Sequence, residues 1–205
     1  MKIFVETNFV LEVALEQQES SACERLLDLA EQRMIQLLVP AYSLVEPHET
    51  LTRRHLDREA LRSRISTELT QLGRSTPLAE RVLASQEVVK LMADSAEYES
   101  KRIEQVKQRI CAIAEILPLD VTVLRGAAEY QERFDLSPQD SVVYASIHGH
   151  LQPEHEATSC FISRNPADFD DPDLRQELAA FKCKYFSSFA TALEYINHAL
   201  TKPGV

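Results

Sequence analysis

The sequence predicts an α/β fold built around a central parallel sheet. Two short apolar runs, residues 3–5 and 34–39, lack the polar alternation of a half-exposed strand, which is typical of strands covered on both faces. The segments between such runs have the apolar spacing of helices, as parallel strands require for their crossovers. Glu6 follows the first run directly, so a carboxylate lies at the carboxyl end of a strand, where open α/β sheets bind ligands.

Composition indicates one ordered domain over residues 1–205, because 44% of the 205 residues are hydrophobic. The net charge of −10 argues against a surface that coats nucleic acid broadly. It still permits a nucleic-acid enzyme whose metal ions neutralise a carboxylate pocket. Four scattered cysteines, no signal-peptide pattern and no apolar run of about 20 residues lead us to expect a cytoplasmic protein without a membrane span.

The first half of the chain predicts a β-α-β-α unit. Residues 9–33 have helical spacing, and Ser20 or Ser21 is available as an N-cap. Residues 34–39 form the second strand, and residues 41–54 are again helical. Pro47 lacks a backbone donor and disfavours helix at the preceding residue, so we expect a kink or a helix restart there.

A helical hairpin is predicted as an insertion over residues 55–117, where the sequence shows no convincing strand. Residues 73–77 separate its two helices. Apolar residues recur every seven positions in the second helix, at Val82, Val89, Ala96, Ile103, Ile110 and Leu117, with a second row at Met92, Val106 and Ile113 that Glu99 interrupts. These rows could pack against Leu61, Ile65, Leu69 and Leu72 of the first helix or against another copy of the protein, and we favour the first arrangement.

The last third of the chain returns to alternating strands and helices. We expect a helix over residues 120–134 and another that Ser137 caps and Gly149 ends. Strands follow over residues 158–163 and 184–187. Ser188 caps the final helix. This pattern closes the chain as an α/β domain.

Acidic and polar residues stand at four places where a metal site could form: Glu6, Glu46, Asp140, and Asn165 with Asp168. The pattern resembles the PIN-domain nucleases, whose motifs here read Glu6-Thr7-Asn8, Glu46, Ser137-Pro138-Gln139-Asp140 with Ala145, and Ser163-Arg164-Asn165 with Asp168-Phe169. The resemblance covers residues 1–54 and 119–198 and leaves the hairpin as an insertion. It implies a three-layer α/β/α domain with a central parallel sheet.

The resemblance also implies metal-dependent hydrolysis of RNA that leaves a 5′-phosphate. Hard divalent ions such as Mg²⁺ or Mn²⁺ take oxygen ligands and can activate water toward a phosphodiester. By family position the catalytic residues are Glu6, Glu46, Asp140 and Asp168, the metal ligands are Glu6, Asp140, Asp168 and Asn165, and the orienting residues are Thr7, Asn8 and Ser163. The family's first acid is normally aspartate, and many members carry an acid where Asn165 stands, so one ion or two are both open.

Each of these residues also has a structural interpretation. Glu6 could face solvent at a strand end. Asp140 lies three residues after Ser137, the spacing of a capping box. Glu49 competes with Glu46 as the inward acid. Residues 165–168 could simply form a turn and the start of a helix.

A basic row on the first hairpin helix is a candidate substrate contact. Arg54, Arg58 and Arg62 follow at i, i+4 and i+8, where like charges repel one another unless an anion is bound. The alternative is a solvated face that pairs with Asp57, Glu59 or acids elsewhere.

The leading prediction is therefore a Mg²⁺/Mn²⁺-dependent endoribonuclease with RNA as its substrate. The alternative is a catalytically impaired PIN-like module that binds RNA or a protein partner, including an antitoxin-like one, through its helical insertion. A phosphotransfer or phosphatase domain fits less well, because its strand would end in an aspartyl nucleophile and not in Glu6. A homodimer and a DNA substrate stay open.

Overall fold

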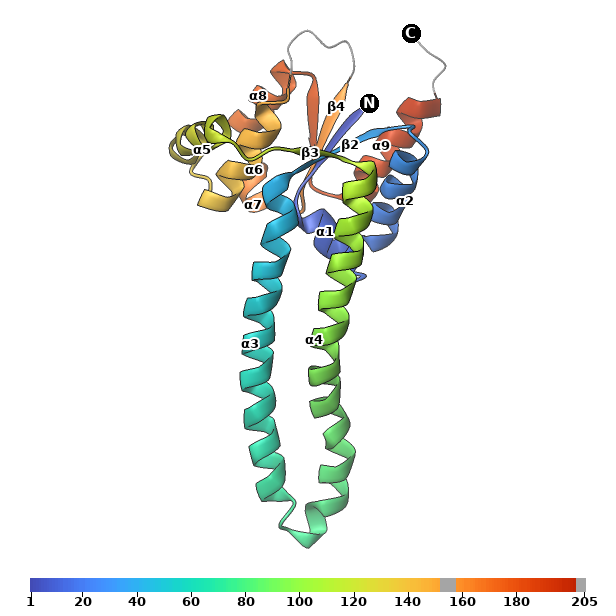
Figure 1. The fold of residues 1–205 in the computed structure, drawn as a ribbon, viewed down its shortest axis with the longest axis vertical. Coiled ribbons are helices and arrows are strands. Elements are labelled where there is room, and N and C mark those ends of the chain that lie inside the picture. Colours follow the sequence, from blue (N-terminus) through green and yellow to red (C-terminus); the bar gives the residue numbers. More distant parts are fainter. Residues whose placement is uncertain (152–157, 202–205) are drawn as a thin grey trace.

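The computed structural model describes residues 1–151 and 158–201, which contain a five-stranded parallel sheet of order β3-β2-β1-β4-β5 (Figure 1). The strands are β1 (Lys2–Val5), β2 (Gln36–Pro40), β3 (Glu115–Leu117), β4 (Ser159–Ile162) and β5 (Cys183–Phe186). β1 is central, since Phe4 pairs in register with Leu38 on one side and Phe161 on the other. The predicted parallel α/β sheet is confirmed.

Helices cover both faces of this sheet, as the uninterrupted apolar runs predict. The helices are α1 (Thr7–Ala14), α2 (Ser20–Glu31), α3 (Ala41–Leu72), α4 (Ala79–Ile113), α5 (Val121–Phe134), α6 (Pro138–His148), α7 (Pro166–Phe169), α8 (Pro172–Ala180) and α9 (Phe189–Thr201). Ile3 and Val5 pack into a core shared with α1, α2, α9 and the base of α4. Phe4 points into the opposite core, shared with α6 and α8. The domain thus has the predicted three layers.

The predicted helix over residues 9–33 is in fact two helices. α1 ends at Ala14 and α2 begins at Ser20, with Glu16 in the left-handed region at a φ of 49°. Ser20 is the first residue of α2 and does not cap it. The backbone N–H of Glu19 instead donates to the buried carboxylate of Glu12 at 2.8 Å. A side chain from the preceding helix therefore fixes this turn.

Of the kink or helix restart predicted at Pro47, the restart is wrong, because α3 continues through this residue from Ala41 to Leu72. Proline inside a helix costs about 3 kcal/mol through its lost donor and its ring. Pro47 is buried where α3 leaves the domain, so tertiary packing offsets this cost.

Two short elements were not predicted. β3 lies inside the range assigned to the hairpin, which therefore ends at Ile113 and not at residue 117. Its three residues form the edge strand beside β2 and are too few to show a pattern. α8 was also missed, and its N-cap Asp171 accepts from the backbone N–H of Asp173 at 2.8 Å.

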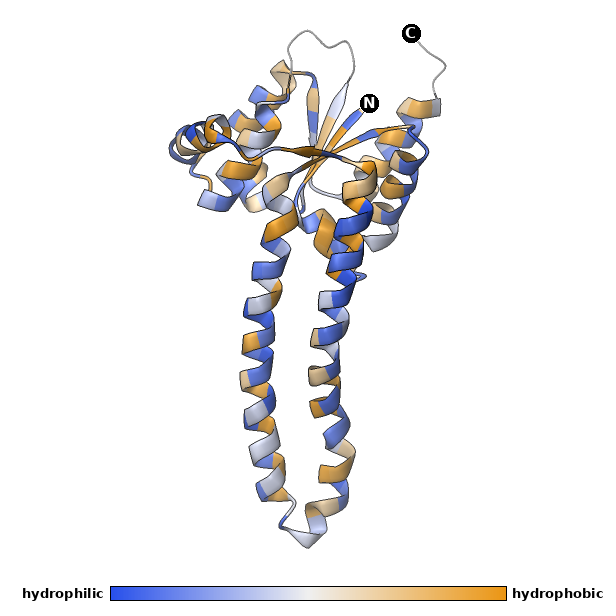
Figure 2. Cartoon of the chain, viewed as in Figure 1, coloured by the Kyte–Doolittle hydropathy of each residue, from blue (hydrophilic) through white to orange (hydrophobic). Residues whose placement is uncertain are grey.

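α3 and α4 form a long antiparallel hairpin that projects from one edge of the domain (Figure 1). Half-buried positions recur along α4 with the predicted heptad spacing and face α3, so intramolecular pairing is confirmed. Of the four expected partners on α3, Ile65 and Leu69 are half-buried, whereas Leu61 and Leu72 are exposed. Polar residues dominate most of the hairpin's length (Figure 2).

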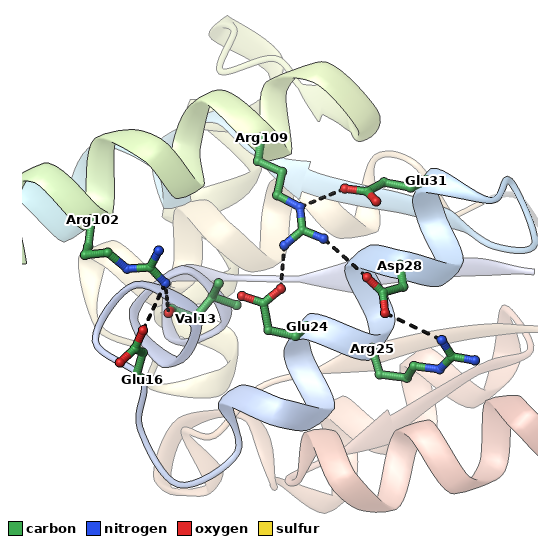
Figure 3. Close-up of polar contacts among 8 residues, drawn as sticks. All are labelled: Val13, Glu16, Glu24, Arg25, Asp28, Glu31, Arg102 and Arg109. Carbon is green, nitrogen blue, oxygen red and sulfur yellow. Dashed lines mark hydrogen bonds and ion pairs between the residues drawn. The ribbon is translucent and has the colours of Figure 1, made fainter.

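Ion pairs attach the base of α4 to the domain (Figure 3). Arg109 binds three acids of α2, which are Glu24, Asp28 at 3.4 Å and Glu31 at 2.7 Å. About two helical turns toward the tip, Arg102 pairs with Glu16 at 3.4 Å. These contacts fix the direction in which α4 leaves the domain. Within the described ranges, no helix is both long and apolar enough to span a membrane.

Candidate active site

Glu6 lies at the junction of β1 and α1 and caps that helix. Its Oε2 accepts from the backbone N–H of Asn8 at 2.8 Å, and the side chain is only 5% exposed. Burial, with a smaller contribution from the charge of Glu46, raises the pKa of Glu6 to about 7, although Asn8 and the nearby Ser163 hydroxyl lower it. Glu6 Oε1 is buried and makes no hydrogen bond to any described residue. The side chain does not face open solvent, so the structural alternative for Glu6 fails.

Glu46 is the inward acid of α3, whereas Glu49 is exposed. The Thr7 hydroxyl donates to Glu46 Oε2, which links the start of α1 to α3. Partial burial raises the pKa of Glu46, as do the nearby charges of Asp140 and Glu49, while the Thr7 hydrogen bond lowers it. Thr7 therefore orients Glu46.

Asp140 lies in the first turn of α6 and combines two roles that the sequence left as alternatives. Its backbone N–H donates to Ser137 Oγ at 3.1 Å, the expected N-cap. The same hydroxyl donates to the Asp140 carboxylate. Burial raises the pKa of Asp140, and so does the charge of Asp168. Capping thus holds a carboxylate that also approaches the other acids.

Asn165 and Asp168 complete the group from the loop after β4. The Asn165 amide donates to Asp140 Oδ1 at 3.4 Å and to Asp168 Oδ2. Ser163 is fully buried, and its hydroxyl accepts from the backbone N–H of Asn165 at 3.0 Å. The segment after β4 therefore begins helix α7 and also contributes Asp168, the fourth acid of the cluster.

These four acids form a continuous electrostatic series, although they come from four separate elements. Glu6 is affected by Glu46, Glu46 by Asp140, and Asp140 by Asp168. All offer oxygen ligands, and the unpartnered Glu6 Oε1 is an atom that a hard cation would satisfy. In the side-chain positions described for residues 1–151 and 158–201, no three His, Cys, Asp or Glu residues already surround an ion-sized space. The donor chemistry therefore fits a divalent cation, while several oxygens are engaged in hydrogen bonds.

The basic row predicted on α3 does not form a free phosphate-binding face. Arg58 points toward α4, where it pairs with Glu99 at 3.0 Å and donates to Ser95 at 2.6 Å. Arg62 pairs with Glu59 on its own helix. Of the three predicted contacts, Arg54 alone is an exposed side chain. Arg58 and Arg62 therefore match the alternative interpretation of the row, in which its arginines pair with acids of this protein, and a substrate contact stays a prediction.

Sequence reasoning missed a partly buried ion pair beside the site. Glu12 is 2% exposed, and its carboxylate binds Arg164, the residue before Asn165. Its other oxygen accepts from Glu19, so one side chain secures both the α1–α2 turn and the loop after β4. The available signal was a single charged residue within the otherwise uncharged helix α1.

A parallel α/β sheet with clustered carboxylates at its carboxyl edge defines a nuclease-like domain. A family model described as PIN domain matches residues 3–169, and the chain therefore belongs to the PIN-domain family. PIN domains are generally nucleases and typically depend on metal ions. A comparison with curated proteins produced no match.

Proposed function

We propose that this protein is a Mg²⁺- or Mn²⁺-dependent endoribonuclease. The observation that carries the proposal is the series of four carboxylates at one sheet edge, which includes a buried oxygen of Glu6 without a hydrogen-bond partner. Carboxylates held together against their repulsion are typical of sites that bind divalent cations. Membership of the PIN-domain family supports phosphodiester hydrolysis as the reaction and RNA as the substrate class.

Glu6, Asp140, Asp168 and the amide oxygen of Asn165 would hold the ion, with Glu46 as the further acid. A bound ion would supply Lewis-acid activation of water and of the phosphodiester. Thr7 donates a hydrogen bond to Glu46, and Ser137 donates one to Asp140, so both carboxylates are oriented before an ion binds. Because Glu6 has a pKa of about 7, cation binding competes with its proton. Asn165 carries no charge, which favours one tightly held ion over two.

A second candidate is a PIN-like module with an impaired site that binds RNA or a protein partner. The supporting observation is that Glu6 uses one carboxylate oxygen to cap α1, while no three metal-type side chains of the described chain already converge. For either candidate we propose a reducing, cytoplasmic location, in keeping with the buried free thiols of Cys23, Cys160 and Cys183.

Cleavage of single-stranded RNA with Mn²⁺ tests the leading proposal, with Asp140→Asn as the inactive variant. Glu49→Gln is the matched control, since it removes an exposed carboxylate one helical turn from Glu46. We expect activity in the wild type and in Glu49→Gln only. Equal activity in Asp140→Asn would contradict the assignment. A wild type that shows no Mn²⁺-dependent thermal shift but binds RNA would instead favour the impaired module.

A further inference from the structure

One side of α3 runs from the carboxylate cluster toward the hairpin. Tyr42, Glu46, Glu49 and Arg53 share this side, because they are spaced by four, three and four positions. We call it the site face of α3, and it consists of these four residues. Glu46 belongs to the cluster itself, so the site face is continuous with the candidate active site.

The site face is open, because α4 contacts the opposite side of α3. His55 and Arg58, which bind Glu99 of α4, lie roughly half a turn around the helix from Arg53. In Figure 1, α6 and α7 lie on one side of α3 and α4 lies on the other. A shallow groove continues along the site face beyond the cluster, and it is lined by Glu49, Thr52, Arg53, Leu56 and Asp57.

Tyr42 places an aromatic ring beside the carboxylates. The ring is half-buried and packs against the core that α6 and α8 share with the sheet. Burial raises the pKa of its hydroxyl, and the charges of Glu46, Glu49 and Asp140 raise it as well, so the ring lies near acids from two helices. An accessible aromatic ring can stack on any nucleobase, because every base has a π-face.

Arg53 supplies a positive charge close to this acidic cluster. Its side chain is exposed, and it forms no ion pair within the described part of the chain, although Glu49 and Asp57 are each four positions away. Arg53 follows Glu46 by seven residues, which is about 10 Å along the helix axis at 1.5 Å per residue. Glu49 repels a phosphate at its own position, so a phosphate contact falls one turn farther along, at Arg53.

We propose that the site face of α3 binds one strand of RNA, with the Tyr42 ring stacked on a base next to the reacting phosphate and Arg53 bound to a neighbouring backbone phosphate. These contacts rest on the proposed function, because they belong to the substrate of the same site. Stacking on a side chain requires an unstacked base, which single-stranded segments offer and an A-form duplex does not. The substrate class is therefore single-stranded RNA.

Fluorescence anisotropy of a short labelled single-stranded RNA tests both contacts. Ca²⁺ replaces Mn²⁺, and a gel run afterwards shows that the RNA is intact, so the measurement does not depend on cleavage. Tyr42→Leu keeps apolar packing against the core but lacks an aromatic face, and it should bind about tenfold more weakly than the wild type. Tyr42→Phe keeps the ring and should bind like the wild type.

Salt dependence separates the phosphate contact from the stacking contact. Arg53→Ala should reduce the slope of log affinity against log salt concentration by about 0.7, the value for one phosphate contact to a single strand. Tyr42→Leu should leave the slope unchanged, since stacking releases no counterion. Arg81→Ala is the matched control for Arg53, because Arg81 is also exposed on a hairpin helix but lies near the far end of the hairpin.

Several outcomes would overturn these contacts. A wild type that binds no RNA, or that binds a duplex as tightly as the single strand, contradicts both of them. Equal binding by Tyr42→Leu and the wild type contradicts stacking. An unchanged slope in Arg53→Ala, or a change in Arg54→Ala in its place, contradicts the phosphate contact.

The same measurements distinguish a failure of these contacts from a failure of the proposed function. If the protein cleaves RNA with Mn²⁺ but Tyr42→Leu and Arg53→Ala bind like the wild type, the contacts are wrong and the nuclease stands. Binding with the expected slopes but without cleavage would reject the nuclease and keep the RNA-binding face.

Discussion

At the scale of single residues, Glu6 combines a structural and a chemical task in one carboxylate. One oxygen caps α1, and the other is buried without a hydrogen-bond partner among the described residues. The location of Glu6 at the carboxyl end of a buried strand was predictable, because this acid directly follows an apolar run. Its hydrogen bonds were not, because they depend on how α1 turns after the strand. The Thr7–Glu46 and Glu12–Arg164 pairs were unpredictable for the same reason, since each joins residues far apart in sequence.

The raised pKa of Glu6 makes the stability of the metal-free protein depend on pH. The folded state binds the Glu6 proton more tightly than the unfolded chain, since its pKa is about 7 against 4.5. This contribution is complete below pH 4.5 and is lost as the pH rises through 7. Glu6→Gln should remove a decline on the order of 3 kcal/mol between pH 4.5 and 8. Guanidinium unfolding in a chelator measures it, and parallel curves for the two proteins would contradict the burial argument.

Loss of the Thr7 hydroxyl should weaken metal binding without unfolding the domain. Thr7→Val keeps the shape of the side chain but leaves Glu46 without its donor. Removal of a group that orients a metal-site carboxylate typically costs 10–100-fold in affinity, and we expect about tenfold for Mn²⁺. Isothermal titration measures this, with Thr52→Val as control because Thr52 bonds only to a backbone carbonyl of its own helix. Equal loss in both variants would refute the role of Thr7.

At the scale of elements, two polar residues of the hairpin that seemed out of place in the sequence, Glu99 and Arg58, are partners in one ion pair. Glu99 interrupts the apolar row of α4, and Arg58 lies on a helix face where we expected a phosphate contact. In the structure they pair at 3.0 Å, with His55 also on Glu99 at 2.9 Å. The heptad pattern predicted the seam, but only the register between α3 and α4 joins its polar members. A polar group at one seam position commonly fixes such a register.

The pairing of Glu99 predicts opposite effects for one substitution and for three. Glu99→Leu alone leaves Arg58 and His55 facing each other in the seam, so hairpin amides should exchange about tenfold faster, a cost of about 1.4 kcal/mol. Replacing all three residues by leucine removes the unpaired charges, and protection should return to the wild-type level or exceed it. Hydrogen exchange followed by mass spectrometry measures both. A triple variant that exchanges faster than Glu99→Leu would show that the polar group stabilises the hairpin by itself.

At the scale of the whole molecule, the acidic domain and the hairpin are separate in packing and in charge. None of the three buried cores includes a residue from 52–102. That segment carries ten Lys or Arg and eight Asp or Glu, a net charge of +2, so the rest of the chain carries −12 of the total of −10. A negative domain attracts divalent cations, whereas an RNA backbone must approach it through bound metal and local basic groups. Fold class was predictable at this scale because it follows from the order of apolar runs.

Separate cores predict that the domain survives without the hairpin. Residues 54–99 would be replaced by a short Gly/Ser linker, which can bridge the gap because His55 and Glu99 bring the two helices together there at 2.9 Å. The remaining chain keeps Leu51, Ile103 and the Arg109 contacts with α2. We expect cooperative unfolding with a Tm within about 5 °C of the wild type, since about 1 kcal/mol shifts Tm by a few degrees at this size. Mn²⁺ binding should also persist, because all four carboxylates lie outside the removed segment. Calorimetry and metal titration measure the two properties, and loss of cooperative unfolding would show that the hairpin is part of the domain's folding unit.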